Sequence, residues 1–183
     1  MNLDSAAIES FESFTDDLLA ERTARPLVIV AASKVNDLLS EILGNFLLPK
    51  IAKAKEQDEL LDGDAPLATF SAKIKLCRRL SLIDQTLYVA LERLRTLRNF
   101  SAHSISFQYA RSPVREHLSE LRKHVAGRDS YRWTNERYFD SAILEPFQEL
   151  QCLLLTLCVL LQAIRENVHR TAGSKDLLGI SAR

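Results

Sequence analysis

Hydrophobic residues recur every three or four positions along nearly the whole chain, which is the pattern of amphipathic α-helices. Residues 8–20 show this pattern, with Ile8, Phe11, Leu18 and Leu19 on one stripe. The same period predicts a second helix that begins near Pro26. It also predicts four later helices at about 67–80, 85–102, 113–125 and 140–170. No segment shows the strict alternation of hydrophobic and polar residues that a half-buried strand would have.

Prolines and polar stretches divide these helices. Pro49 lies inside the second apolar stretch and predicts a kink or break near Leu48. The acidic stretch 56–66 contains a glycine and a proline and is the clearest loop. Residues 128–139 are basic and aromatic without a sustained period, so they could stack on nucleic-acid bases or pack as aromatic anchors.

Length and composition agree with this pattern. A chain of 183 residues suits one domain with a sizeable core, and five glycines and five prolines are few for a β-sandwich or a disordered chain. We therefore predict an all-α, single-domain helical bundle of about six helices over residues 1–172. Residues 173–183 are predicted to form a frayed C-terminal tail.

The most apolar segment is LLLTLCVLLQAI, residues 153–164. It is shorter than the roughly 20 residues that cross a membrane, and the chain does not start like a signal peptide. The segment therefore predicts a buried helix in a protein without membrane contact. Its leucines occupy more faces than one stripe can bury, which predicts self-association, most simply as a homodimer.

The cysteines Cys77, Cys152 and Cys158 lie in apolar helical surroundings and lack the spacing of metal ligands. They are typical of small reduced core residues, which favours a cytoplasmic protein. The sequence contains no glycine-rich phosphate loop, no zinc-protease motif and no nucleophile elbow. We therefore expect no metal and no cofactor.

The net charge is zero, but the charges are unevenly placed. Residues 1–64 hold thirteen acidic and six basic side chains, whereas residues 65–137 hold six acidic and fourteen basic ones. The central segment could give one face a positive field, or its charges could simply solvate helix faces. A DNA-binding domain usually carries a larger positive excess, so the balance argues against direct DNA binding.

The segment RNFSAH brings Arg98, Asn99 and His103 together near the end of a predicted helix. An arginine can grip a phosphate or carboxylate, and a histidine can move a proton near neutral pH. Five helical steps of about 100° place Arg98 and His103 roughly 140° apart. The two can act on one substrate only if the helix ends or unwinds between them, or if a second chain supplies its own copy.

A structural role for the same residues is the alternative. Leu87, Leu91 and Leu94 form an apolar stripe, and the next position on this stripe is Arg98. The stripe predicts that Arg98 is largely buried and anchored by hydrogen bonds. His103 would then lie favourably near the negative end of the helix dipole.

Residues 66–104, PLATFSAKIKLCRRLSLIDQTLYVALERLRTLRNFSAHS, resemble the mannitol operon repressor (MtlR) family of small bacterial all-helical proteins. The matching features are Pro-Leu before Phe-Ser-Ala-Lys-Ile-Lys, the turn Leu-Ser-Leu-Ile, and a helix that ends Leu-Arg-Asn-Phe-Ser-Ala-His. This ending also resembles the arginine–polar–x3–histidine signature of HEPN domains, which are four-helix bundles that often dimerise.

The two resemblances imply different functions. Similarity to MtlR implies a transcription-related regulatory protein that acts mainly through contacts with a protein partner, which the sequence does not identify. Similarity to active HEPN members implies a metal-independent ribonuclease of toxin type, built from two facing copies of Arg98, Asn99 and His103. In that enzyme His103 would deprotonate a ribose 2′-hydroxyl and Arg98 would stabilise the phosphorane. We favour the regulatory hypothesis, because a neutral chain holds RNA only weakly.

Overall fold

The computed structural model describes residues 5–47, 58–103, 112, 114–141 and 143–173, and this part of the chain contains seven helices and no strand. The helices are α1 (Ser5–Ala20), α2 (Ala24–Phe46), α3 (Phe70–Arg79), α4 (Gln85–His103), α5 (Val114–Val125), α6 (Asp129–Phe139) and α7 (Pro146–Gly173). The predicted all-α helical bundle is therefore confirmed. The predicted break at Pro49 and the tail after Gly173 lie outside the described residues.

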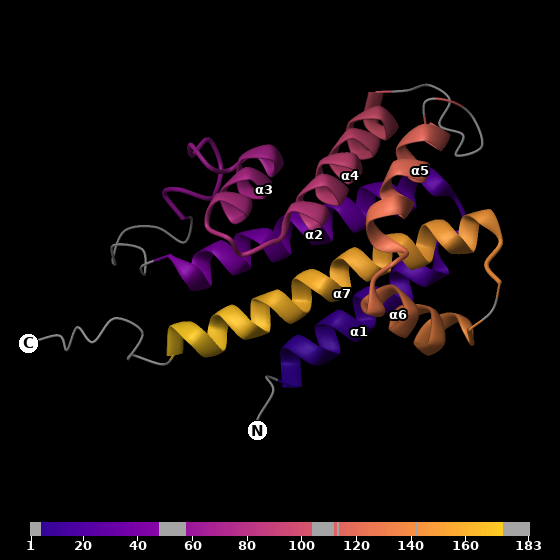
Figure 1. Ribbon diagram of the computed structural model, residues 1–183. Helices are drawn as coiled ribbons and strands as arrows, with labels where there is room; N and C mark the ends of the chain where they lie inside the picture. The colour runs from indigo at the N-terminus through magenta and orange to yellow at the C-terminus, as the bar shows by residue number, and fades with distance from the viewer. Residues whose placement is uncertain (1–4, 48–57, 104–111, 113, 142, 174–183) are drawn as a thin grey trace, which may run out of the picture.

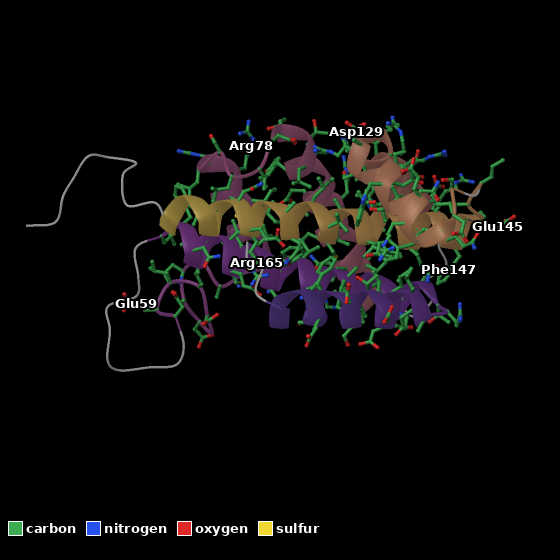
Figure 2. The ribbon with its side chains drawn as sticks, turned by 90° about the horizontal axis from the view of Figure 1, so that it is seen from below. Glu59, Arg78, Asp129, Glu145, Phe147 and Arg165 are labelled. Carbon is green, nitrogen blue, oxygen red and sulfur yellow. The ribbon has the colours of Figure 1, made fainter. Side chains whose placement is uncertain are left out.

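The two longest helices, α2 and α7, form the centre of the bundle and make the most extensive contact between any two helices. Figure 1 shows α7 crossing the molecule, with α3 and α4 on one side of it and α1 and α6 on the other. An ion pair of 2.5 Å between Arg165 Nε and Glu41 Oε2 joins the two central helices. Figure 2 shows Arg165 on the side of α7 that faces α2.

The central position of α7 explains its composition and corrects one prediction. Every residue from Leu150 to Cys158 is buried, and Val159 and Leu160 are partly buried. These residues are covered because α1, α2, α5 and α6 all pack against α7. Apolar excess on α7 is therefore no evidence for a second chain, and that argument for a homodimer was wrong. Self-association stays a prediction without this support.

Helix α7 is also longer than the apolar run in its sequence suggests. Pro146–Val168 is long and apolar enough to cross a membrane, by length and composition alone, with a mean hydropathy of 1.7 in its most apolar window. Within the bundle, 56% of that window is buried against the rest of the protein. This burial is what the core helix of a helical bundle shows.

Helix α6 was not predicted, and it is the seventh helix. Thr134 is the one fully buried residue of this helix. A helix with so little buried surface needs no hydrophobic stripe, so its sequence shows none. Tyr131 and Tyr138 nevertheless pack against the hydrophobic core, and α6 lies against α7. The helix ends at Asp140, which adopts the left-handed conformation with φ of 54°. Tertiary packing of two tyrosines therefore outweighs the weak local period.

The start of α4 is held by Asp84, the residue directly before the helix. Its Oδ1 accepts a hydrogen bond of 2.6 Å from the backbone N–H of Leu87, which is N-terminal capping. Arg128 Nη2 reaches both carboxylate oxygens of Asp84, at 2.8 and 3.0 Å. The Arg128 guanidinium holds the pKa of the Asp84 carboxyl below its usual range. One carboxylate thus caps α4 and ties it to the segment that enters α6.

The lowered pKa of Asp84 predicts a pH-dependent contribution to stability. Its contribution is present above the unfolded pKa of about 4 and is lost as the pH falls through the lower folded pKa. Asp84→Asn keeps a capping oxygen and removes the charge, so we expect it to be less stable than the wild type at pH 6 and nearly equal at pH 2. The effect is modest because the Asp84 side chain is 58% exposed. Urea unfolding of both proteins at the two pH values is the measurement, and a difference that does not change with pH would contradict the ion pair.

Candidate functional site

The helix α4 carries the predicted site residues, and its buried face differs from the predicted one. Leu87, Leu91 and Leu94 are buried as expected, but the stripe continues to Leu97 and Ser101. Arg98 is exposed instead of buried. The prediction continued the stripe four residues beyond Leu94, to Arg98, and this was wrong. The helices α2, α3 and α5 instead cover the face that contains Leu97, three residues beyond Leu94.

Arg98 is therefore a surface cation. Its Nη1 donates a hydrogen bond of 3.3 Å to Oδ1 of Asn99, which is a neutral group on the same helix. The exposed guanidinium retains further donors for a ligand, since an arginine carries five N–H groups. Arg98 and Asn99 are thus brought together, as the motif requires, on an accessible surface.

His103 is exposed at the last position of α4, and none of the described residues forms a hydrogen bond with its imidazole that would fix it. The helix continues without interruption from Arg98 to His103. The angle of about 140° between the two side chains therefore persists, and unwinding does not bring them onto one substrate within a single chain. Their joint action would need a second chain.

A groove lies beside Arg98, between α2, the start of α3 and α4. We call it the α2–α3–α4 groove; its volume is about 500 Å³. Figure 1 shows the three helices that form it, with α3 beside α4 and above α2. Its walls include Ile29, Asn36, Thr69, Phe70, Arg95, Arg98 and Asn99. His103 is not part of these walls, so the structure separates it from the other two predicted site residues.

Hydrogen bonds fix the position of α3, which forms one wall of the groove. Thr69 caps α3, since its Oγ1 accepts from the backbone N–H of Ala72 at 3.2 Å. One turn later, the buried Lys73 donates from Nζ to Ser40 Oγ on α2 at 2.7 Å. Ser40 Oγ in turn donates to the backbone oxygen of Asn36 at 3.0 Å. This chain of hydrogen bonds fixes α3 against α2.

The two arginines of the groove differ in their electrostatic surroundings. Arg95 donates from Nε and Nη2 to Glu92 Oε2, at 3.1 and 2.8 Å, so its charge is largely offset. Among the described residues, Arg98 forms a hydrogen bond only with the neutral Oδ1 of Asn99. No acidic residue lies in the described walls of the groove. The groove therefore holds one uncompensated positive charge.

The cysteines are unsuited to chemistry at the surface. Cys77, Cys152 and Cys158 are all free and buried, as the sequence predicts. Burial raises the pKa of the Cys77 and Cys158 thiols to about 12, and that of Cys152 to about 11. Thiols of this kind remain protonated and unreactive near neutral pH. Among the described residues, no group of three His, Cys, Asp or Glu side chains could hold a metal ion.

Sequence reasoning missed the residues that α2 and α3 contribute to the site. Ile29 and Asn36 lie on a helix that the sequence predicted only as a core element. The one available signal was Lys73, a charged residue in the first turn of α3. This residue is only 4% exposed. A lysine buried in this way indicates a specific polar partner on another helix.

Two solved structures share the arrangement of these helices over nearly their entire length. One is the crystal structure of a possible transcriptional regulator, YggD, from Shigella flexneri 2a str. 2457T, with 13% identity and a TM-score of 0.58. The other is the MtlR–HPr complex from Escherichia coli, with 20% identity and a TM-score of 0.55. The alignments cover 86% and 87% of this chain, and 98% of each of those chains.

Sequence comparison adds no closer relative. No protein-family model and no curated protein sequence matches the chain. At 13% and 20% identity, the structural matches establish a common fold and leave function to be argued from the site. This chain therefore has the all-helical fold of the possible regulator YggD and of the MtlR protein solved with HPr.

Proposed function

We propose that this chain is a bacterial, cytoplasmic regulatory protein that acts by binding another protein through the α2–α3–α4 groove. The observation that carries the proposal is the combination of exposed apolar surface and unbalanced charge in one groove. Ile29 is a large hydrophobic residue that remains 39% exposed, and it shares the groove with Arg98. Protein-binding sites combine an apolar contact with an arginine anchor in this way.

The structural neighbours support this direction. One of them is described as a possible transcriptional regulator, and the other was solved with a protein, HPr, bound to it. A regulatory protein that works through a protein partner needs no catalytic centre and no cofactor. The free, buried cysteines are compatible with a reducing compartment, which supports a cytoplasmic location.

The arrangement of α3 and α4 supports a role without a DNA-reading motif in the described part of the chain. A helix-turn-helix protein places its second helix in the major groove, with several side chains free to reach base edges. In this chain α4 buries Leu87, Leu91 and Leu94 in the core. Its remaining face carries Arg95 together with Glu92, and the Glu92 carboxylate would repel DNA phosphates.

The test is capture of a partner by the full chain and by two charge-reversal variants. The wild type and Arg132→Glu are expected to retain one stoichiometric protein from bacterial lysate, after nuclease treatment, whereas Arg98→Glu loses it. Arg132 is a matched control because it is 72% exposed on α6, whose main contact is with α7. Circular dichroism checks that all three proteins are folded. Failure of the wild type to retain any stoichiometric protein would contradict the proposal.

A ribonuclease remains the second candidate function, because Arg98 and His103 are both exposed and accessible to RNA. It would require a dimer that places the motifs of two chains together. The same preparations, incubated with RNA in chelator, distinguish the two functions. We expect no cleavage by the wild type. Cleavage that disappears in His103→Ala at a matched concentration of folded protein would overturn the regulatory proposal.

A further inference from the structure

The polar groups of the α2–α3–α4 groove are not satisfied by the groove itself. Arg98 has one neutral hydrogen-bond partner, and no carboxylate lies in the described walls. Asn36 contributes a second unsatisfied group, since its Oδ1 is buried and has no hydrogen-bond partner among the described residues. A buried acceptor without a donor lowers the stability of the fold. Of these two groups, the exposed guanidinium of Arg98 is the one that the groove presents to a ligand.

Apolar surface lies beside these two groups. Ile29 stands on the α2 wall and is 39% exposed, and Phe70 contributes from the start of α3. Burial of the exposed part of Ile29 by a ligand is favourable in proportion to the apolar area removed from water. A volume of about 500 Å³ is typical of pockets that hold a small ligand or a few residues of a peptide. The occupant is therefore short and only partly polar.

We propose that the groove binds a short acidic segment of a partner protein, in which a carboxylate side chain lies next to an apolar one. The carboxylate pairs with Arg98, and the apolar side chain covers Ile29. The inference deepens the proposed function and rests on it, because it specifies the chemistry of the partner. Charge complementarity selects an acid, since Arg98 is an uncompensated cation and the described walls contain no carboxylate.

The same charges disfavour RNA as the occupant. Nucleic-acid affinity comes from several phosphate contacts at once, and each contact needs a cation of its own. Among the described residues of the groove, Arg95 is already paired with Glu92, so Arg98 is the one available cation. A single cation beside an isoleucine matches one carboxylate with an apolar neighbour better than it matches a chain of phosphates.

The experiment begins with a display library of random 12-residue peptides selected on the full wild-type chain. The best peptide is then synthesised with a fluorescent label, together with a twin in which each Asp becomes Asn and each Glu becomes Gln. Fluorescence anisotropy gives the Kd of both peptides for the wild type, Arg98→Glu, Arg98→Lys and Arg132→Glu. Because Arg98 and Arg132 are both exposed, we expect these substitutions to leave the fold intact.

We expect the selected peptides to be enriched in Asp or Glu next to Leu, Ile or Phe. The neutral twin and the Arg98→Glu variant should each bind at least tenfold more weakly, Arg98→Lys should bind between the two, and Arg132→Glu should match the wild type. Selection of peptides without an acidic excess would overturn the inference. So would equal affinity for wild type and Arg98→Glu, or tighter binding of a 12-nucleotide uridine RNA than of any peptide.

The two proposals fail in distinguishable ways. If lysate capture yields a partner that Arg98→Glu still binds, and no acidic peptide is selected, the protein-binding function stands and the acidic-segment inference is wrong. If acidic peptides bind through Arg98 but no partner protein is captured, the groove chemistry stands and the proposed function is wrong. A tryptophan at Ser33, which lines the groove on α2, provides a steric check, since Ser33→Trp should block the peptide.

Discussion

Replacement of Leu154 by alanine is expected to lower the free energy of unfolding by about 2–5 kcal/mol. Leu154 is fully buried in the middle of α7, where this helix packs against α2. Removal of its isobutyl group eliminates favourable burial and leaves a cavity that the surrounding helices fill only in part. The loss is a large share of the total stability of a domain of this size. Urea unfolding monitored by circular dichroism measures it.

Leu60→Ala is the matched control for this prediction. It removes the same atoms from a leucine that is 43% exposed, so it should cost no more than about 1 kcal/mol. Equal losses for the two variants would show that α7 is not the core helix that the bundle requires. The pair therefore also tests whether the apolar excess of α7 is satisfied within one chain, as the burial of residues 150–158 indicates.

The second large effect is expected at Ser40, whose hydroxyl oxygen accepts the hydrogen bond from the buried Lys73 ammonium at 2.7 Å. Ser40→Ala removes that acceptor and should cost about 1–3 kcal/mol, because a buried cation is left without its partner. Lys73→Met should cost less, because methionine keeps most of the apolar stem and carries no charge that needs a partner. Urea unfolding of the two single variants tests this asymmetry.

The double variant completes the comparison. In the Lys73→Met background, Ser40→Ala should have only a small effect, because Ser40 then has only its helical contact with the Asn36 backbone to lose. If Ser40→Ala costs less than about 0.5 kcal/mol in the wild-type background, the hydrogen bond does not hold α3 on α2. The α3 wall of the groove would then lack the fixed position that a preformed binding site needs.

Hydrophobic periodicity alone determined six of the seven described helices and the all-α class. The helix predictions succeeded because side-chain directions repeat every 3.6 residues within a helix. The spacing of apolar residues in a short stretch of sequence therefore shows which face is buried. The cap of α4 at Asp84 was equally readable, since a carboxylate directly before a helix accepts from its first free N–H groups. These features depend only on neighbours within a few residues.

Other features depended on which helices meet. Arg98 is exposed because the helices around α4 cover the face that leads from Leu94 to Leu97, although steps of three and four look alike in sequence. The sequence of α6 has no apolar stripe, and its helix depends on tyrosines that reach the core beside α7. Likewise, the leucines of α7 suggested a second chain until four neighbouring helices were seen to cover them.

The sequence by itself therefore determined the class of fold, most helix positions, the buried reduced cysteines and the cluster of Arg98 with Asn99. Tertiary structure alone decided that Arg98 and Asn99 line a groove and that His103 lies outside it. The groove walls come from segments that are far apart in the sequence, such as Asn36 on α2 and Ala68 before α3, which are 32 residues apart. Such a site has no local signature, because helix packing angles and distances, set by the whole core, decide which side chains meet.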